Sequence, residues 1–375
     1  MAMDRLFLLM KEKAASDLFI AVNAAIHVKI AGQLIPVNQT KMDQASIMAL
    51  LSEVVPAAKL AELELENELN IGIPVQGVGS FRLSAFRQRG SISAVVRYIP
   101  GDIPALDTLH LPAVLPDLIM EKRGLLLVVG ATGSGKSTTI ASMLDHRNAL
   151  RSGHILTLED PIEFLFRNKK SIVNQREIGT DSRDLALALR NALRQAPDCM
   201  LIGEIRDAET MSAALAYAQS GHLVVATLHA NNSYQALTRI VNFYALEHRQ
   251  SLLSDLSATL RAIVSQRLIG TIDGKRRPAV EVMINTRHVA ELIEQGELSQ
   301  IKEAIDNSMS PGSQTFEQAL LQLIQDGIVT QEEALSHADS ASNLFWLLNN
   351  QNGKAEEEAP VKEEGASFTE FTLKM

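Results

Sequence analysis

The sequence lacks three features that would assign it to whole classes of proteins: paired cysteines, an excess of basic charge, and long apolar runs. Cys199 is the single cysteine among 375 residues, which excludes an intramolecular disulfide framework and fits a reducing compartment such as the cytosol. The 35 basic and 44 acidic side chains give a net charge of −9, which does not favour a nucleic acid as partner. No uncharged apolar run approaches the ~18 residues of a membrane span, so we expect any membrane role to depend on a partner.

The composition is that of a globular protein, with 46% apolar and 21% charged residues, and the length suits two domains rather than one. A helix-like start, short β-like runs and two stretches of alternating apolar and polar residues predict a small α+β domain over residues 1–99. In the alternating stretches Arg82 and Arg97 lie opposite in phase to apolar neighbours, as on the exposed face of an antiparallel pair. Residues 100–112, which begin Pro-Gly-Asp-Ile-Pro, form the predicted linker.

From residue 113 onwards, helix-like segments interleave with apolar runs of strand length, which is the pattern of an α/β domain with a parallel sheet. We expect this domain to occupy residues 113–284. Its candidate strands are 125–129, 155–158, 199–202 and 223–227. A further helix is expected over 253–268, and a hairpin at Asp273-Gly274. Residues 285–348 have helical periodicity, and the acidic composition of 349–375 predicts a disordered tail.

Residues 125–138 contain the clearest functional motif: an apolar strand, the loop Gly-Ala-Thr-Gly-Ser-Gly-Lys-Ser-Thr, and then a helix-like segment. This is the strand–loop–helix context of a phosphate-binding loop, in which glycines let successive backbone N–H groups turn towards a polyphosphate. Lys136 can reach the β- and γ-phosphates, and the Ser137 hydroxyl can ligate Mg²⁺. A flexible turn would account for the glycines, but not for the Gly-Lys-Ser triplet or for the strand and helix on either side. We therefore predict nucleotide binding.

Carboxylates follow two of the other predicted strands, at the edge where parallel sheets gather their ligands. Hydrolysis needs one carboxylate to position or deprotonate water and another to anchor the metal shell. Residues 157–163, Thr-Leu-Glu-Asp-Pro-Ile-Glu, offer three, and the apolar run that begins at Cys199 ends in Glu204. Either stretch, taken alone, could be a solvated acidic loop. His222 and His229 flank another strand at an odd separation and would point to opposite faces, so a shared metal is not expected.

Together these stretches resemble the secretion and type IV pilus motor ATPases, and within them the PilT/PilU family of pilus retraction ATPases. Four motifs occur in that family's order: its Walker A at 130–138, its Asp box at 158–163, its Walker B at 202–207 and its His box at 221–229. Ala-Ser-Asp-Leu at 15–18 and Asn-Gln-Arg-Glu-Ile-Gly at 174–179 are also similar to the retraction branch. The resemblance implies a PAS-like amino-terminal domain followed by a RecA-like P-loop ATPase domain.

The resemblance also implies roles for individual residues. Glu163 would be the catalytic carboxylate that polarises water, Glu204 would act through the metal shell, and His229 would sense the γ-phosphate. Ser137 would ligate Mg²⁺, with Glu204 reaching the ion through water. The implied nucleotide-binding residues are Gly130, Ala131, Thr132, Gly133, Ser134, Gly135, Lys136, Ser137, Thr138, Arg82, Arg97, Arg194 and Arg206. Arg190 could contribute at a packed interface or could be an exposed arginine of little energetic weight.

As a function, the resemblance implies a cytoplasmic homo-hexameric ring that hydrolyses ATP with Mg²⁺. It would act on a platform protein at the inner-membrane pilus base, in pilus retraction and twitching motility. The PilT branch carries an Ala-Ile-Arg motif and a further arginine after the hairpin, whereas the basic positions correspond here to Ala290 and Glu294. This departure favours the accessory PilU branch and a PilT-like paralogue as partner. Two alternatives stay open: a nucleotide-responsive coupling subunit that does not work alone, and a related ATPase of pilus extension, secretion or DNA transfer.

Overall fold

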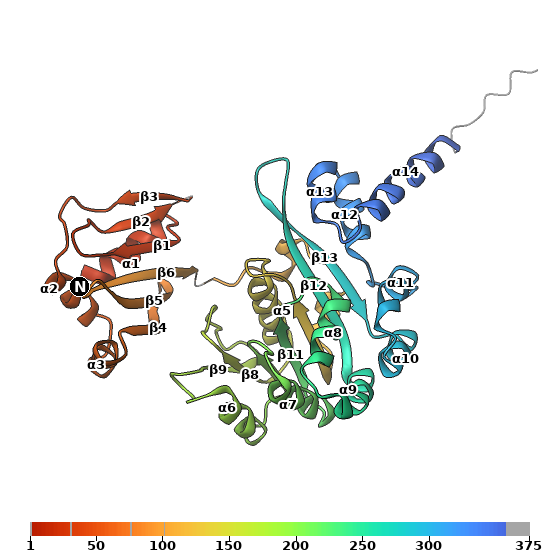
Figure 1. Ribbon diagram of the computed structural model, residues 1–375, viewed down its shortest axis with the longest axis horizontal. Coiled ribbons are helices and arrows are strands. Elements are labelled where there is room, and N and C mark those ends of the chain that lie inside the picture. Colours follow the sequence, from red (N-terminus) through yellow and green to blue (C-terminus); the bar gives the residue numbers. More distant parts are fainter. Residues whose placement is uncertain (1, 31, 76, 101, 358–375) are drawn as a thin grey trace, which may run out of the picture. The chain divides into compact units, whose positions relative to one another are not determined.

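Two β-sheets organise the part of the chain that the computed structural model describes, residues 2–30, 32–75, 77–100 and 102–357 (Figure 1). The first sheet lies wholly within the first hundred residues, and its strands follow one another closely in sequence. Helices separate most strands of the second sheet. The predicted class, a small α+β domain followed by an α/β domain with a parallel sheet, is confirmed.

The amino-terminal sheet has six antiparallel strands, and one of its faces is buried. The elements are α1 (Ala2–Glu12), β1 (Asp17–Ile20), β2 (His27–Ile30), β3 (Gln33–Pro36), α2 (Gln44–Ser52), α3 (Ala57–Glu66), β4 (Glu68–Val75), β5 (Gly79–Gln88) and β6 (Ser91–Pro100), with strand order β3-β2-β1-β6-β5-β4. Leu83 and Val96 pair across β5 and β6 and are fully buried. Arg82 and Arg97 pair in the next position and are exposed, as the alternation predicted.

The second sheet has seven strands in the order β13-β12-β7-β11-β10-β8-β9, and those from β12 to β9 run parallel. Its strands are β7 (Gly124–Val129), β8 (Gly153–Glu159), β9 (Ser171–Glu177), β10 (Cys199–Ile202), β11 (Leu223–Leu228), β12 (Leu260–Gly270) and β13 (Arg276–Ile284). The helices in this part of the chain are η1 (Leu106–Leu109), α4 (Leu115–Ile119), α5 (Lys136–Leu150), α6 (Leu185–Ala192), η2 (Leu193–Gln195), α7 (Ala208–Gln219), α8 (Ser233–Asn242), α9 (Leu246–Thr259), α10 (Arg287–Gln295), η3 (Leu298–Gln300) and α11 (Ile301–Asp306).

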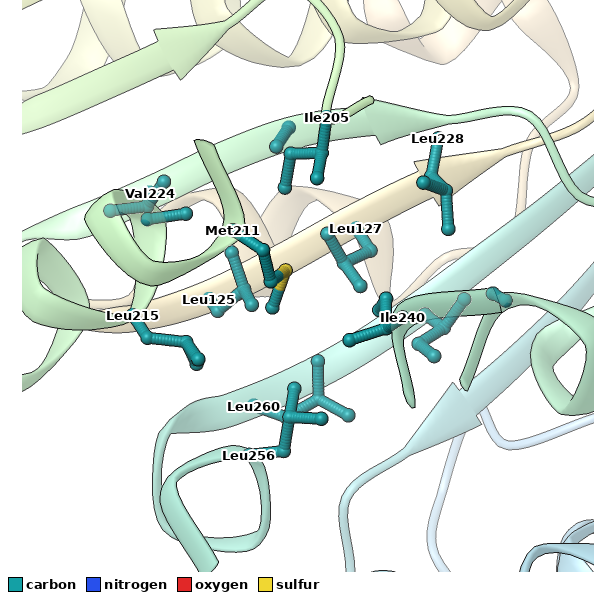
Figure 2. Packing of buried hydrophobic residues seen from close by; sticks show 14 of the residues in the cluster. Leu125, Leu127, Ile205, Met211, Leu215, Val224, Leu228, Ile240, Leu256 and Leu260 are labelled. Atoms are coloured by element: carbon teal, nitrogen blue, oxygen red, sulfur yellow. The ribbon is translucent and has the colours of Figure 1, made fainter. Parts of the chain in front are cut away.

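The central strand β7 is buried on both faces, and this burial explains its uninterrupted apolar sequence. Leu125 and Leu127 point into one cluster, together with Val224 of β11 and Met211 of α7 (Figure 2). Leu126 and Val128 of β7 belong to a second cluster, which contains Cys199. Cys199 is therefore a buried strand residue, and burial raises the pKa of its thiol to about 11.

One local prediction is wrong, and two strands were not predicted. The helix expected over 253–268 is wrong in its second half, because α9 ends at Thr259 and β12 begins at Leu260. Short apolar runs do not distinguish helix from strand by periodicity, and here pairing with β7 selects the strand. β4 and β9 were not predicted. Both carry mixed polar and apolar residues without a clean alternation.

The chain divides by contact density into two compact units. The smaller unit combines the hairpin tip, Ile269–Arg276, with the helices α12 (Phe316–Gln325), α13 (Gln331–His337) and α14 (Ala341–Glu357). Because α14 extends to Glu357, the prediction of disorder from residue 349 is wrong for residues 349–357, which continue the helix although asparagine and glycine are poor helix formers. The rest of the predicted tail, 358–375, lies outside the described residues. The domain boundaries predicted at 99, 112 and 284 stay predictions.

Candidate active site

A cavity of about 760 Å³ opens where several parallel strands of the second sheet end. Its lining comes from the loops that follow β7, β8, β10 and β11, so the strand order brings together segments that are far apart in the sequence. The predicted site residues that line it are Thr132, Gly133, Gly135, Lys136, Ser137, Thr138, Glu163, Glu204, Arg206 and His229. The remaining loop residues, Gly130, Ala131 and Ser134, belong to the same phosphate loop but are not among the lining residues.

The phosphate loop is packed so closely that two of its glycines leave no room for a side chain. A Cβ atom on Gly130 would lie 2.5 Å from the Gln266 backbone oxygen, and one on Gly135 would lie 2.7 Å from Gln266 Nε2. Gln266 itself is buried on β12, donates to the Ser134 carbonyl at 2.9 Å and accepts from the Thr139 hydroxyl at 2.8 Å. The loop is therefore held to β12 by a side chain that the sequence patterns did not single out.

Lys136 opens helix α5 and is 9% exposed. Its ammonium donates hydrogen bonds to the carbonyl oxygens of Gly130 and Ala131, both at 2.8 Å. Burial lowers the pKa of Lys136, while the nearby carboxylates of Glu163 and Glu204 oppose that shift. The helix start adds backbone N–H groups and the positive end of the helix dipole, so this corner of the cavity is suited to phosphate. Ser137 follows Lys136 directly in the first turn of α5, and its hydroxyl-bearing side chain is half-buried.

Glu204 and His229 meet at the ends of β10 and β11. Glu204 Oε1 lies 3.3 Å from His229 Nε2, and Glu204 Oε2 accepts from Arg206 Nε at 2.7 Å. The bond to Glu204 raises the pKa of Arg206. Asp160, which follows β8, lies 4.0 Å from Arg206 Nη1. The structure thus brings Glu204 and His229 together, whereas His222 lies at the other end of β11 and hydrogen-bonds with Ser220.

Glu163 lies on the loop between β8 and β9, where its exposed side chain lines the cavity. Glu159, at the end of β8, is buried and accepts hydrogen bonds from Thr157 Oγ1 at 2.6 Å and Gln175 Nε2 at 3.1 Å. Burial raises the pKa of Glu159. The predictions included the stretch of Glu159 but gave it no role, and they gave none to Gln175. The only signal for Gln175 is its place in the family-like segment 174–179.

Of the predicted arginines that do not line the cavity, Arg97 and Arg194 hydrogen-bond to neighbouring side chains. Arg97 Nε donates to Asp17 Oδ1 at 2.9 Å, across the pair β1 and β6. Arg194 Nη1 donates to Asn191 Oδ1 at 3.1 Å, and Arg190 is exposed at the end of α6. Arg82 is exposed on β5. A nucleotide role for these four residues stays a prediction.

The donor set around the cavity fits a nucleotide with Mg²⁺ better than a protein-bound metal. Among the described residues no group of three or more histidine, cysteine, aspartate or glutamate side chains is placed to hold a metal ion. A hydroxyl beside a phosphate loop, with one carboxylate nearby, is what Mg²⁺ uses when phosphate oxygens and water complete its shell.

Along the described chain, none of the helices has both the length and the apolar character to cross a membrane.

Comparisons with known proteins support the same assignment. The family model described as Type II/IV secretion system protein matches residues 3–336. The type IV pilus ATPase PilU of Pseudomonas aeruginosa is 44% identical over 349 residues, covering 93% of this chain and 91% of that protein. The type IV pilus retraction ATPase PilT of the same organism is 37% identical over 333 residues, covering 89% of this chain and 97% of PilT.

A solved structure agrees with the sequence relatives. The crystal structure of the pilus retraction motor PilT with bound ADP matches with a TM-score of 0.83 and 39% identity, covering 89% of this chain and 97% of that one. The predicted resemblance, fold class and ATPase activity are confirmed at the level of the family, as is a role in pilus retraction. The chain therefore belongs to the Type II/IV secretion system protein family.

Proposed function

We propose that this chain hydrolyses Mg²⁺-ATP in the cavity and uses the reaction to assist type IV pilus retraction beside a PilT-like paralogue. One observation carries the proposal: Lys136, Glu163, Glu204 and His229, from four separate segments, line a single cavity with the phosphate loop. The similarity to PilU and PilT supplies the biological setting. When bound, Mg²⁺ would neutralise charge on the β- and γ-phosphate oxygens.

The phosphate end of the site consists of Lys136 and the first turn of α5. The Lys136 ammonium, which donates to the Gly130 and Ala131 carbonyls, would exchange these acceptors for phosphate oxygens when ATP binds. Backbone N–H groups from Thr132 onwards would bind the remaining oxygens. The Ser137 hydroxyl would hold Mg²⁺ directly, and Glu204 would reach the ion through water.

The hydrolytic end of the site consists of Glu163 and His229. The Glu163 carboxylate would orient the attacking water and accept its proton as the bond to the γ-phosphorus forms and the bond to ADP breaks. His229, 3.3 Å from Glu204, would contact the γ-phosphate and report its loss to the loop after β11. Arg206 is paired with Glu204 at 2.7 Å and would exchange this partner for phosphate.

Arginines from other parts of the chain would complete the site in a homo-hexameric ring. Arg82 and Arg97 would reach the nucleotide when the amino-terminal domain closes, and Arg194 would act at a packed interface. The ring would work in the cytoplasm at the inner-membrane base of the pilus, on a platform protein. The residue ranges 1–99 and 113–284 would then be the two moving domains, joined by the linker at 100–112.

A second candidate function is a coupling subunit that binds nucleotide but turns over only with its paralogue. The observation that favours it lies in α10, where Ala290 is half-buried and Glu294 is exposed. Both positions are basic in the PilT branch of the family, and the sequence departs from that branch here. In this case the cavity would control assembly, and the paralogue would supply most of the force.

Phosphate release by the purified chain, alone and with a PilT-like partner, separates these functions. We expect Lys136→Ala to abolish both nucleotide binding and turnover. Glu163→Gln should keep binding but lower turnover by about 10²–10⁴-fold, the usual contribution of a positioned acid–base group. Glu204→Gln should keep binding and lower turnover by weakening the metal shell. Turnover that all three variants retain would refute the site. Turnover that appears only with the partner would favour the coupling subunit.

A further inference from the structure

The loop that carries Glu163 has no regular secondary structure of its own and is held by side chains of neighbouring elements. It begins after β8 and ends before β9. Asn148 of α5 binds its second half, through the Lys169 N–H at 3.2 Å and the Arg167 carbonyl at 2.7 Å. Nearer the cavity, the Ile162 N–H donates to Glu177 Oε2 at 3.1 Å. The position of Glu163 therefore depends on these anchors rather than on a helix or strand.

Gln175 of β9 binds the loop backbone directly after Glu163. Its Oε1 accepts from the Phe166 N–H at 2.9 Å, and its Nε2 donates to the Phe164 carbonyl at 2.7 Å. Phe164 directly follows Glu163 in the chain. A single planar amide thus binds one donor and one acceptor of the loop backbone, which fixes the amide orientation and the local path of the loop together.

The same amide also reaches the buried carboxyl beneath the loop. Gln175 Nε2 lies 3.1 Å from Glu159 Oε1, which also accepts from Thr157. Because Glu159 is 9% exposed, water competes little for these hydrogen bonds.

We propose that Gln175 is a positioning residue that holds Glu163 in place for its reaction with water. The inference rests on the proposed role of Glu163, since Gln175 has no place in the chemistry itself. A loop freed from this clamp would keep its sequence and its nucleotide contacts at Lys136 but would present the carboxylate in many positions. A displacement of about 1 Å can cost about 10² in rate when the reacting groups must be aligned.

The test uses the full chain and a substitution that keeps the size of the side chain. Gln175→Met retains its length but removes the donor and the acceptor. We expect kcat for ATP to fall about 10–100-fold, with the ATP KM and the affinity for a fluorescent ATP analogue unchanged within about twofold. Asn174→Ala is the matched control, because Asn174 is the neighbour on β9 and bonds instead to His154 at 2.9 Å. It should leave kcat unchanged.

A double-mutant cycle with Glu163→Gln separates this inference from the function on which it rests. If Gln175 acts through Glu163, then Gln175→Met should lower the residual turnover of Glu163→Gln no further. Full turnover of Glu163→Gln would refute the role of Glu163. A normal kcat in Gln175→Met, with Glu163→Gln inactive, would refute the clamp alone. Additive losses, or equal losses of binding and kcat, would show that Gln175 supports the fold in general and would also overturn the inference.

Discussion

The close packing of the phosphate loop leads to a prediction about two glycines that look alike in the sequence. Gly130 and Gly133 both have positive φ, at 155° and 79°. A Cβ atom at Gly133 would meet no atom within 4 Å, whereas one at Gly130 would lie 2.5 Å from the Gln266 backbone oxygen and 2.5 Å from Ser134 Oγ. Substitution by alanine should therefore be far more damaging at Gly130 than at Gly133.

The magnitude follows from the two kinds of strain. Gly133→Ala meets only the backbone penalty of a left-handed conformation, about 1–2 kcal/mol. Gly130→Ala adds an overpacking cost of about 1–3 kcal/mol, because a backbone oxygen of β12 cannot turn away as a side chain can. At about 2–4 °C per kcal/mol for a domain of this size, the thermal midpoint should fall by about 2–8 °C for Gly133→Ala and about 4–20 °C for Gly130→Ala.

Thermal unfolding of the purified variants without nucleotide measures this difference directly. Omitting nucleotide matters, because Gly133 lines the cavity and an added methyl group could obstruct phosphate. Titration with a fluorescent ATP analogue, done separately, then reports the effect on binding. If the midpoint of Gly130→Ala lay at or above that of Gly133→Ala, the proposed contact between the loop and β12 would be refuted.

Three further predictions concern buried charge. Burial raises the pKa of Glu159 above 4.5, which disfavours its ionised form. The thermal midpoint of Glu159→Gln should therefore rise relative to that of wild type as pH rises from 4 to 8, and a difference in midpoint that stays constant with pH would contradict this. Burial lowers the pKa of Lys136, so wild type should gain stability over Lys136→Met as pH rises towards 10.5, measured by the same unfolding assay. Glu281 accepts hydrogen bonds from the N–H and hydroxyl of Ser233, at 2.8 and 2.7 Å. Glu281→Leu should lower the free energy of unfolding in urea by about 3–5 kcal/mol, and a loss under about 1 kcal/mol would contradict this prediction.

Local patterns in the sequence were sufficient where neighbouring residues alone decide the structure. The strand at Cys199–Ile202 has the bounds predicted, because a short apolar run between polar turns is typical of a buried strand in an α/β protein. The phosphate loop was recognisable because its strand, glycines, lysine and helix are contiguous. The helix expected over 253–268 failed because residues after Thr259 extend along β7, and such pairing is not visible in a window of sequence.

By itself, then, the sequence determined the α/β class, the phosphate loop and the acids that follow the strands, since each depends on residues adjacent in the chain. The tertiary structure alone decided that Glu163, Glu204 and His229 would line one cavity, because the strand order β7-β11-β10-β8 brings their loops to one edge of the sheet. It also decided that Gln175 binds the backbone beside Glu163 and that Gln266 closes on the phosphate loop. Side-chain contacts across strands leave no periodic signal, because any polar residue of suitable length can make them.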